Sequence, residues 1–213
     1  AALSAATTAA RPPESRVSVR VFRCENCQAL VYFTSVECVN CQARLGFMPE
    51  ERSMGAFFAR EDGSLQRCVD SSMSWRHCRN AQSACACTWL IRSDDPEAQC
   101  LSCRLTTTIP DQQSPENRQA WRDLESAKRN WLATVLDLHL PVLPRSADPA
   151  RGLRFHFLRQ VDASRPVLTG HAAGEITLNG IESDPVERAR SRLALMEPYR
   201  TLLGHFRHES GHY

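Results

Sequence analysis

Cys24-Glu-Asn-Cys27, followed after ten residues by Cys38-Val-Asn-Cys41, is the stretch of sequence that decides the fold of the N-terminal half. Each Cys-x-x-Cys pair can turn two thiolates toward one ion, and residues 28–37 are long enough for a hairpin that brings the second pair opposite the first. Four thiolates complete a tetrahedral zinc shell with no open position, so the spacing predicts a structural zinc site. Two disulfides, or an iron ion with the same four ligands, are the alternatives, and we favour zinc.

A third Cys-x-x-Cys pair, Cys100-Leu-Ser-Cys103, supplies half of a second site of the same kind. The spacing alone does not choose the other half from the four remaining cysteines: Cys68, Cys78, Cys85 and Cys87. Cys78 and Cys87 would leave intervals of eight and twelve residues, with Trp89 placed to shield the sulfurs. His77 is a conceivable ligand in place of one cysteine.

The distribution of cysteine divides the chain, because all ten cysteines lie between Cys24 and Cys103. We expect a flexible tail over residues 1–16, a small β module with two sites of four cysteines each over residues 17–105, and a second module over residues 106–213. The β module has short apolar stretches and little helical periodicity, so we expect it to bury little core and to depend on metal for stability.

The C-terminal module is predicted to be α+β. Ser114-Pro-Glu116 has the residues of a helix start, and apolar side chains then recur at helical spacing until about Pro141: Trp121, Leu124, Ala127, Trp131, Val135 and Leu138. Residues 153–158 and 175–179 alternate as strands do, and we expect the second of these strands to lie beside a cleft. Asp184-Pro185 opens a further helix, and Pro198 a last one over Tyr199–Tyr213.

Composition excludes several classes of function. The formal charge is +2, too small for a surface that binds polyanions, so we do not expect nucleic acid as a partner. Nothing approaches the roughly 18 consecutive apolar residues of a membrane span. Leu3 is the only large apolar residue of Ala1–Ser15, so no secretory leader is indicated. We therefore expect a cytoplasmic protein whose cysteines bind metal.

His208-Glu-Ser-Gly-His212 is the motif that carries reaction chemistry. On a helix the two histidines lie on one face and can hold one Zn²⁺, while Glu209 can act as general base toward a water that the metal polarises. The pattern predicts amide hydrolysis; two surface histidines on a helix are the alternative. His205 shares the face but cannot easily join the same ion, so we give it a supporting role. His171, Glu175 and Glu197 are predicted to be structural.

Short segments spread from about Val17 to the end of the chain carry a further signal. They are Phe22-Arg-Cys-Glu-Asn-Cys27, Cys38-Val-Asn-Cys41, Leu45-Gly-Phe-Met-Pro49, Cys87-Thr-Trp-Leu90, Cys100-Leu-Ser-Cys-Arg-Leu105, Ile109-Pro-Asp111, Pro115-Glu-Asn-Arg118, Val167-Leu-Thr-Gly-His171, Ile176-Thr-Leu-Asn179 and Glu197-Pro-Tyr-Arg-Thr-Leu-Leu-Gly-His-Phe-Arg-His-Glu-Ser-Gly-His-Tyr213. In these segments the sequence resembles a family of bacterial zinc-binding metallopeptidases with an N-terminal zinc-ribbon domain.

The resemblance implies a zinc-ribbon module followed by the first part of a zincin-like peptidase domain. It implies His208 and His212 as catalytic zinc ligands, Glu209 as acid and base, and a third ligand downstream of Tyr213. We therefore expect a fragment with little or no activity by itself. The Cys-x-Trp segment favours Cys87 over Cys85, so the second structural site is assigned to four cysteines: Cys78, Cys87, Cys100 and Cys103. Cys68 and Cys85 are left as spare thiols.

The leading hypothesis is thus a zinc metallopeptidase that acts on peptide or protein substrates and takes two structural zinc ions and one catalytic one. The alternative is a non-catalytic zinc-ribbon adaptor that binds protein or nucleic acid. The motifs leave the cleavage preference and the oligomeric state open.

Overall fold

The computed structural model describes residues 21–159, 164, 166–197 and 199–213. The predicted tail over residues 1–16 and the predicted helix start at Pro198 lie outside them. The elements follow one another as β1 (Phe22–Arg23), β2 (Leu30–Val31), β3 (Arg44–Met48), β4 (Ser53–Ala59), β5 (Leu65–Arg67), β6 (Ser74–His77), the 3₁₀ helix η1 (Arg79–Gln82), β7 (Leu90–Arg92), α1 (Leu101–Arg104), β8 (Thr106–Thr108), α2 (Pro115–Asp137), β9 (Arg154–Leu158), β10 (Gly170–Ala172), β11 (Glu175–Asn179), the 3₁₀ helix η2 (Gly180–Ser183), α3 (Pro185–Leu195) and α4 (Leu202–Gly211).

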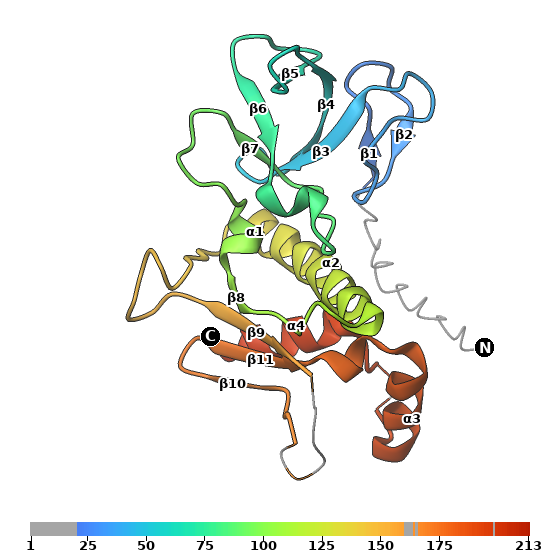
Figure 1. Cartoon of the computed structure of the whole chain (residues 1–213), viewed down its shortest axis with the longest axis vertical. Helices are drawn as coiled ribbons and strands as arrows, with labels where there is room; N and C mark the ends of the chain where they lie inside the picture. Colours follow the sequence, from blue (N-terminus) through green and yellow to red (C-terminus); the bar gives the residue numbers. More distant parts are fainter. Residues whose placement is uncertain (1–20, 160–163, 165, 198) are drawn as a thin grey trace, which may run out of the picture.

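The N-terminal module is a β structure in two parts (Figure 1). β1 and β2 form a small hairpin, and β3 to β7 form an antiparallel sheet in chain order. The sheet curls until Phe47, on the first strand, bridges to Trp89, just before the last. Contrary to the expectation of a small core, this sheet has its own buried cluster: Met48, Phe57, Leu65, Trp75 and Leu90. The expectation was wrong because these residues lie on separate short strands and show no periodicity until the strands pair.

The C-terminal module is a four-stranded sheet covered by helices, in the order β10-β11-β9-β8. β8, β9 and β11 are parallel neighbours, and β10 pairs antiparallel with β11 at the edge. β9 and β11 confirm the two predicted strands, with Glu175 opposite Arg154 and Asn179 opposite Leu158. The edge strand beside β11 is β10, which the sequence did not predict, so β11 is an inner strand of the sheet.

Helix α2 begins where the sequence places it. Ser114 accepts a hydrogen bond from the backbone N–H of Asn117, and Pro115 occupies the first turn. The helix crosses the molecule between the two modules (Figure 1) and ends at Asp137, so Leu138 lies beyond it and is 64% exposed. Trp131 packs against Phe155 of the sheet, at 5.4 Å between ring centroids, and against Phe206 of α4 at 6.3 Å. α2 therefore packs against both the sheet and the last helix, α4.

The last two helices differ from expectation in one respect each. α3 has the predicted Asp184 cap, but its apolar residues are not buried: Leu193 is 80% exposed, and Met196, just beyond its end, is 88% exposed. α4 begins at Leu202 rather than Tyr199, because the side chain of Thr201 accepts from the N–H of Gly204 and caps the helix there. Across the described residues, none of the helices combines the length and apolar character that crossing a membrane requires.

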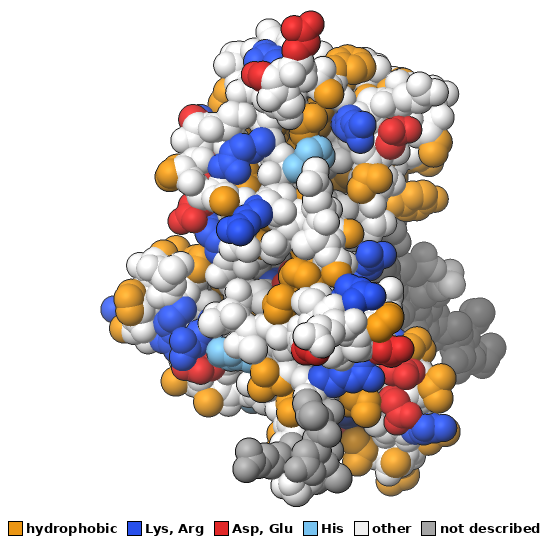
Figure 2. Space-filling model, in the orientation of Figure 1, with side chains coloured by type: hydrophobic (Ala, Val, Ile, Leu, Met, Phe, Trp, Pro, Cys, Tyr) orange, Lys and Arg blue, Asp and Glu red, His pale blue; other side chains and the backbone are white. Residues whose placement is uncertain are grey.

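The visible face of the molecule carries basic and acidic side chains interspersed with hydrophobic ones (Figure 2). A mixed surface of this kind agrees with the small net charge of +2.

Candidate metal centres

The first cysteine cluster is built from two copies of one turn. Gln28 follows the first Cys-x-x-Cys pair and Gln42 the second, both with positive φ (63° and 59°). Their N–H groups donate to the carbonyl oxygens of Cys24 and Cys38, each at 2.8 Å. These turns aim the four thiols at one point, where sulfur separations are 3.6 Å for Cys24–Cys41 and 3.5 Å for Cys27–Cys38.

The two turns also adjust the acidity of the thiols. A side-chain hydrogen bond from Asn40 is the main cause that lowers the pKa of Cys27 to about 6, and one from Asn26 lowers the pKa of Cys41. Each asparagine therefore favours a thiolate on the opposite pair. Cys24 is fully buried, and burial raises its pKa to about 12. Since metal binding requires thiolates, the two asparagines favour the ligand form of this cluster.

The second cysteine cluster is deeper. Cys78 follows β6, Cys87 lies just before β7, and Cys100 and Cys103 belong to the start of α1. All four are buried, with exposures between 1% and 4%. The Sγ atoms of Cys87 and Cys100 lie 3.6 Å apart, and the N–H of Cys100 donates to the Sγ of Cys78 at 3.4 Å. The structure thus brings together the four cysteines that the sequence assigned to this site.

Both clusters fit a tetrahedral zinc ion. At Zn–S distances of about 2.3 Å, the sulfurs of a tetrahedron lie about 3.8 Å apart, close to the separations found here. A disulfide needs about 2.05 Å, and all ten cysteines are free, so the disulfide alternative is not supported. In each cluster the four sulfurs all lie within 4.8 Å of one another.

The remaining thiols and His77 lie outside these two clusters. The Cys85 side chain is fully buried, and a hydrogen bond with Cys103 is the main cause that raises its pKa. Cys68 is partly buried on the chain after β5, and burial raises its pKa. His77 is exposed at the end of β6, so the structure brings Cys78, and not His77, to the other three ligands.

The third candidate centre lies on α4. His208 and His212 are exposed, with ring centroids 5.1 Å apart, whereas Glu209 is only 8% exposed. One ligand atom from each of the three residues lies within 4.8 Å of the others. Phe206 fixes the inner face of this helix. Its side chain is fully buried and packs against Trp131, Phe155 and Phe157. The imidazoles are thereby held on the outer face of a fixed helix.

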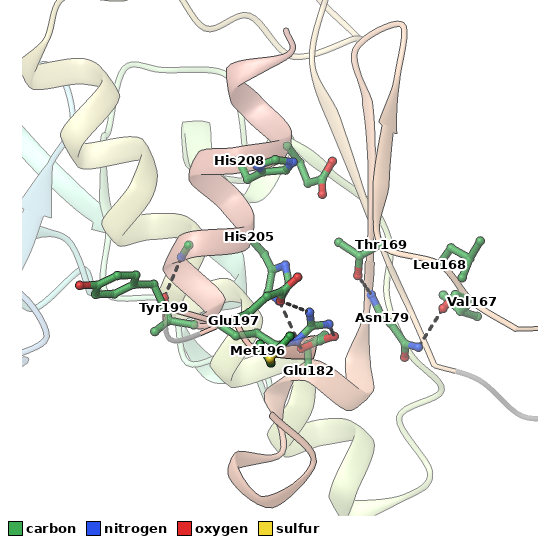
Figure 3. Close-up of a pocket in the computed structure, with 14 residues that line it drawn as sticks. Val167, Leu168, Thr169, Asn179, Glu182, Met196, Glu197, Tyr199, His205 and His208 are labelled. Carbon is green, nitrogen blue, oxygen red and sulfur yellow. Dashed lines mark hydrogen bonds and ion pairs between the residues drawn. The ribbon is translucent and has the colours of Figure 1, made fainter. Parts of the chain in front are cut away.

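A cleft of about 900 Å³ lies along the first turns of α4. Figure 3 shows His205 and His208 on the helix facing Thr169 and Leu168 on the chain that leads into β10. A second hollow of about 550 Å³ adjoins the other end of the helix, where His212 and Tyr213 meet His171. The candidate ligands therefore stand between two cavities.

A network of ion-paired side chains lines the bottom of the larger cleft. Glu182 of η2 is 6% exposed and forms ion pairs with Arg200 and with His205, whose Nε2 lies 3.2 Å from the carboxylate. Burial raises the pKa of Glu182, but the hydrogen bonds from His205 and Arg200 outweigh it and lower the pKa to about 2. Helical spacing predicted a supporting role for His205. It did not single out Glu182 or Arg200, because the pair that they form joins residues 18 positions apart.

The other histidine and carboxylates with predicted structural roles are placed as follows. His171 lies on β10 with its ring stacked 6.0 Å from that of His212, and its Nε2 accepts from the N–H of Gly174 at 3.1 Å. Glu175 forms ion pairs with Arg154 and Arg145, and Glu197 pairs with Arg200. The proximity of His171 to a candidate ligand was missed, because nothing in the sequence places β10 beside α4.

Comparison with known proteins gives two adjoining family matches. Residues 21–114 match a family model described as a zinc-ribbon domain, and residues 117–213 match one described as "Putative zinc-binding metallo-peptidase". The first matched range contains both cysteine clusters and the second contains the His208–His212 motif.

The similar curated proteins are uncharacterized proteins of Mycobacterium bovis and of two strains of Mycobacterium tuberculosis. Each is 36% identical over 195 residues, which make up 92% of this chain and 53% of the relative. The chain thus spans about half the length of these relatives. No solved structure matches it. The chain, an α+β structure with cysteine clusters in its N-terminal half, is thus similar to a zinc-ribbon domain over that half and to a zinc-binding metallopeptidase family over the rest.

Proposed function

We propose that the chain provides the ribbon and the nucleophile-activating half of a zinc-dependent peptidase. The observation that carries this proposal is the convergence of His208, Glu209 and His212 on α4, beside a cleft of about 900 Å³. Two imidazoles on one helix face are donors that zinc takes in hydrolytic sites, and the carboxylate between them can serve as general base. The reaction we propose is hydrolysis of peptide bonds in peptide or protein substrates.

The residues have separate roles in this proposal. A zinc ion held by His208 and His212 would polarise a peptide carbonyl and acidify water. Glu209 accepts the proton of the attacking water and later delivers it to the amine that leaves. β10 is an edge strand of the sheet and its His171 lines the hollow at His212, so an extended substrate can pair with it as an added strand.

We further propose that a third protein ligand lies C-terminal to Tyr213 in the longer protein. Catalytic zinc sites usually have three protein ligands, and α4 contributes two. The chain by itself would then hold this zinc weakly and hydrolyse peptides slowly. The metal-binding thiols favour the cytoplasm as the place of action, because thiolates persist in a reducing compartment.

Metal content tests the assignment of the ligands. A version of the protein of the length of the mycobacterial relatives is expected to hold three zinc ions, two on thiolates and one on α4. His208→Ala should remove one of the three, whereas His139→Ala, a control outside the three candidate centres, should remove none. If His208→Ala leaves the zinc content unaltered, α4 holds no metal and the ribbon-adaptor alternative takes precedence.

Peptide hydrolysis by the same longer protein tests the role of Glu209. Glu209→Gln is expected to retain zinc but to lower kcat by about 100-fold or more, because a general base contributes about that factor. Glu197→Gln is the matched control, since Glu197 also lines the cleft but does not belong to the ligand group. Equal rates for wild type and Glu209→Gln would exclude Glu209 from the mechanism.

A further inference from the structure

The charge on Arg129 has no carboxylate partner among the described residues. Arg129 lies on α2, is 5% exposed, and its Nη1 atom is buried without a hydrogen-bond partner. Its Nη2 donates to the carbonyl oxygen of Cys85 at a long 3.5 Å. The nearby carboxylate of Glu125 is ion-paired with Lys128 instead, at 3.0 Å. A guanidinium buried in this way needs a counter-charge, since an unpaired buried charge costs several kcal/mol.

Besides Glu125, the second cysteine cluster is a source of negative charge near Arg129. Four thiolates exceed the charge of Zn²⁺ by about two, and this cluster is buried, so its charge is not dissipated by water. Burial lowers the pKa of Arg129, but Cys87, Glu125, Cys85 and Cys103 outweigh burial and raise it. The hydrogen bond from Arg129 to Cys85, two residues before the ligand Cys87, independently places the guanidinium on the loop that carries this ligand.

We infer that Arg129 is the counter-ion of the metal-loaded Cys78/Cys87/Cys100/Cys103 cluster, so that this zinc site is completed by a helix of the peptidase module. A second contact ties the same helix to the same loop. Arg122, about two turns earlier on α2, donates from Nε to the carbonyl oxygen of Ala84 at 2.9 Å. Arg129 acts as a positioning residue: it does not ligate the metal but stabilises the charge of the site.

The inferred counter-ion links the ribbon to the candidate catalytic helix. Trp131, two residues after Arg129, packs on Phe206, which lies in α4 between His205 and His208. Loss of zinc from the second cluster would leave Arg129 buried without a counter-ion. This would destabilise α2 near Trp131, the residue that packs against α4. This inference concerns the structural zinc and holds whether or not α4 is catalytic.

Zinc release to a chromogenic chelator tests the inference on the full chain. Wild type should release zinc in two phases: a fast one from the first cluster, where Cys27 and Cys41 are partly exposed, and a slow one from the buried second cluster. Arg129→Met is expected to accelerate the slow phase by about 10- to 100-fold and to leave the fast phase unchanged. Arg129→Lys keeps the charge and should stay within a few-fold of wild type.

Arg122→Met is the matched control, because Arg122 contacts the same loop from the same helix but is exposed. It should leave both phases unaltered if charge compensation, and not attachment of the loop, retains the zinc. Wild-type release from Arg129→Met, equal acceleration of both phases, or an effect of Arg129→Lys as large as that of Arg129→Met would overturn the inference.

A charge-compensating variant covers the case in which Arg129→Met does not fold. Cys87→His removes one negative charge from the loaded site while keeping a zinc ligand. The double variant Arg129→Met with Cys87→His should then fold and retain the second zinc longer than Arg129→Met. A double variant that is no better than Arg129→Met would show that charge is not what the arginine contributes.

Discussion

Lys128, the only lysine in the chain, is fully buried beneath the sheet of the C-terminal module. Its Nζ pairs with Glu125 at 3.0 Å, donates to the hydroxyl of Thr106, and lies 5.7 Å and 5.4 Å from the ring centroids of Phe155 and Phe157. The second carboxylate oxygen of Glu125 has no partner. Burial of an ion pair in so apolar a site carries a large unfavourable desolvation free energy.

Removal of one partner should therefore lower the free energy of unfolding more than removal of both partners. Lys128→Met is expected to lower the free energy of unfolding by about 3–5 kcal/mol, because it leaves Glu125 charged and buried. The double variant Glu125→Leu with Lys128→Met should recover most of that loss. Denaturant unfolding of the zinc-loaded chain measures both values. A single variant within about 1 kcal/mol of wild type would contradict this account.

Glu182 makes stability depend on pH in the acid range. Its pKa falls from 4.5 to about 2 on folding, so the carboxylate contributes stability that is present in full above pH 4.5 and is lost as the pH falls toward 2. A shift of this size corresponds to about 3 kcal/mol. Glu182→Gln should lower stability at neutral pH by an amount of that order and flatten the pH dependence in this window. Unchanged acid unfolding of the variant would disprove the assignment.

Single residues were predictable from sequence where the chemistry depends on short spacing. The cysteine pairs and the His208–His212 motif lie within three to four residues of one another, so their side chains converge wherever the fold puts them. Arg129 and Glu182 derive their roles from partners far away in the chain or charges on another element. Nothing in the local sequence distinguishes them from solvent-exposed residues on a helix or a loop.

At the scale of elements, capping residues predicted helix starts well. Ser114 and Asp184 cap α2 and α3 as expected, because the signal is a side chain next to the backbone it binds. The sequence missed β10, whose three residues Gly170–Ala172 are too short to show alternation and become a strand by pairing with β11. The sequence also did not predict that the apolar residues of α3 are exposed, since periodicity identifies an apolar helix face but not the element that covers it.

The contact between β3 and β7 can be tested at one glycine. A Cβ on Gly46 would lie 2.5 Å from the Cγ of Leu90, so the two strands meet here without room for a side chain. Gly46→Ala is expected to lower the free energy of unfolding by about 1–3 kcal/mol. Gly170→Ala is the control, because a Cβ there meets nothing within 4 Å. Equal stability of the two variants, measured in denaturant, would exclude a tight contact between these strands.

At the scale of the whole molecule, one hydrophobic cluster crosses both modules. It contains cysteines of both zinc clusters, Trp89 of the β module, and Trp121, Phe155 and Phe206 of the C-terminal module. Two modules could be anticipated from the distribution of cysteine. Their shared core could not, since it depends on α2 lying between them (Figure 1).

Removal of zinc should consequently unfold both modules together. The tryptophans report on the unfolding of the two modules separately: Trp75 and Trp89 lie in the β module, and Trp121 and Trp131 lie on α2. Titration with a zinc chelator is expected to give one cooperative loss of near-UV circular dichroism and helical signal, because structural zinc contributes folding free energy directly. Zinc added back should restore both signals. A helical signal that survives loss of both zinc ions would show that the modules fold independently.

β8 begins only three residues after Cys103, the last thiolate ligand, and enters the sheet of the C-terminal module beside β9. The cysteine-rich module and the sheet of the C-terminal module therefore have no spacer between them. In evolutionary terms, a recombination crossover at this point would separate a sheet strand from the zinc site that fixes its start. The two parts are thus expected to be inherited as a single unit, and a ribbon exchanged from an unrelated protein would have to bring its own β8 with it.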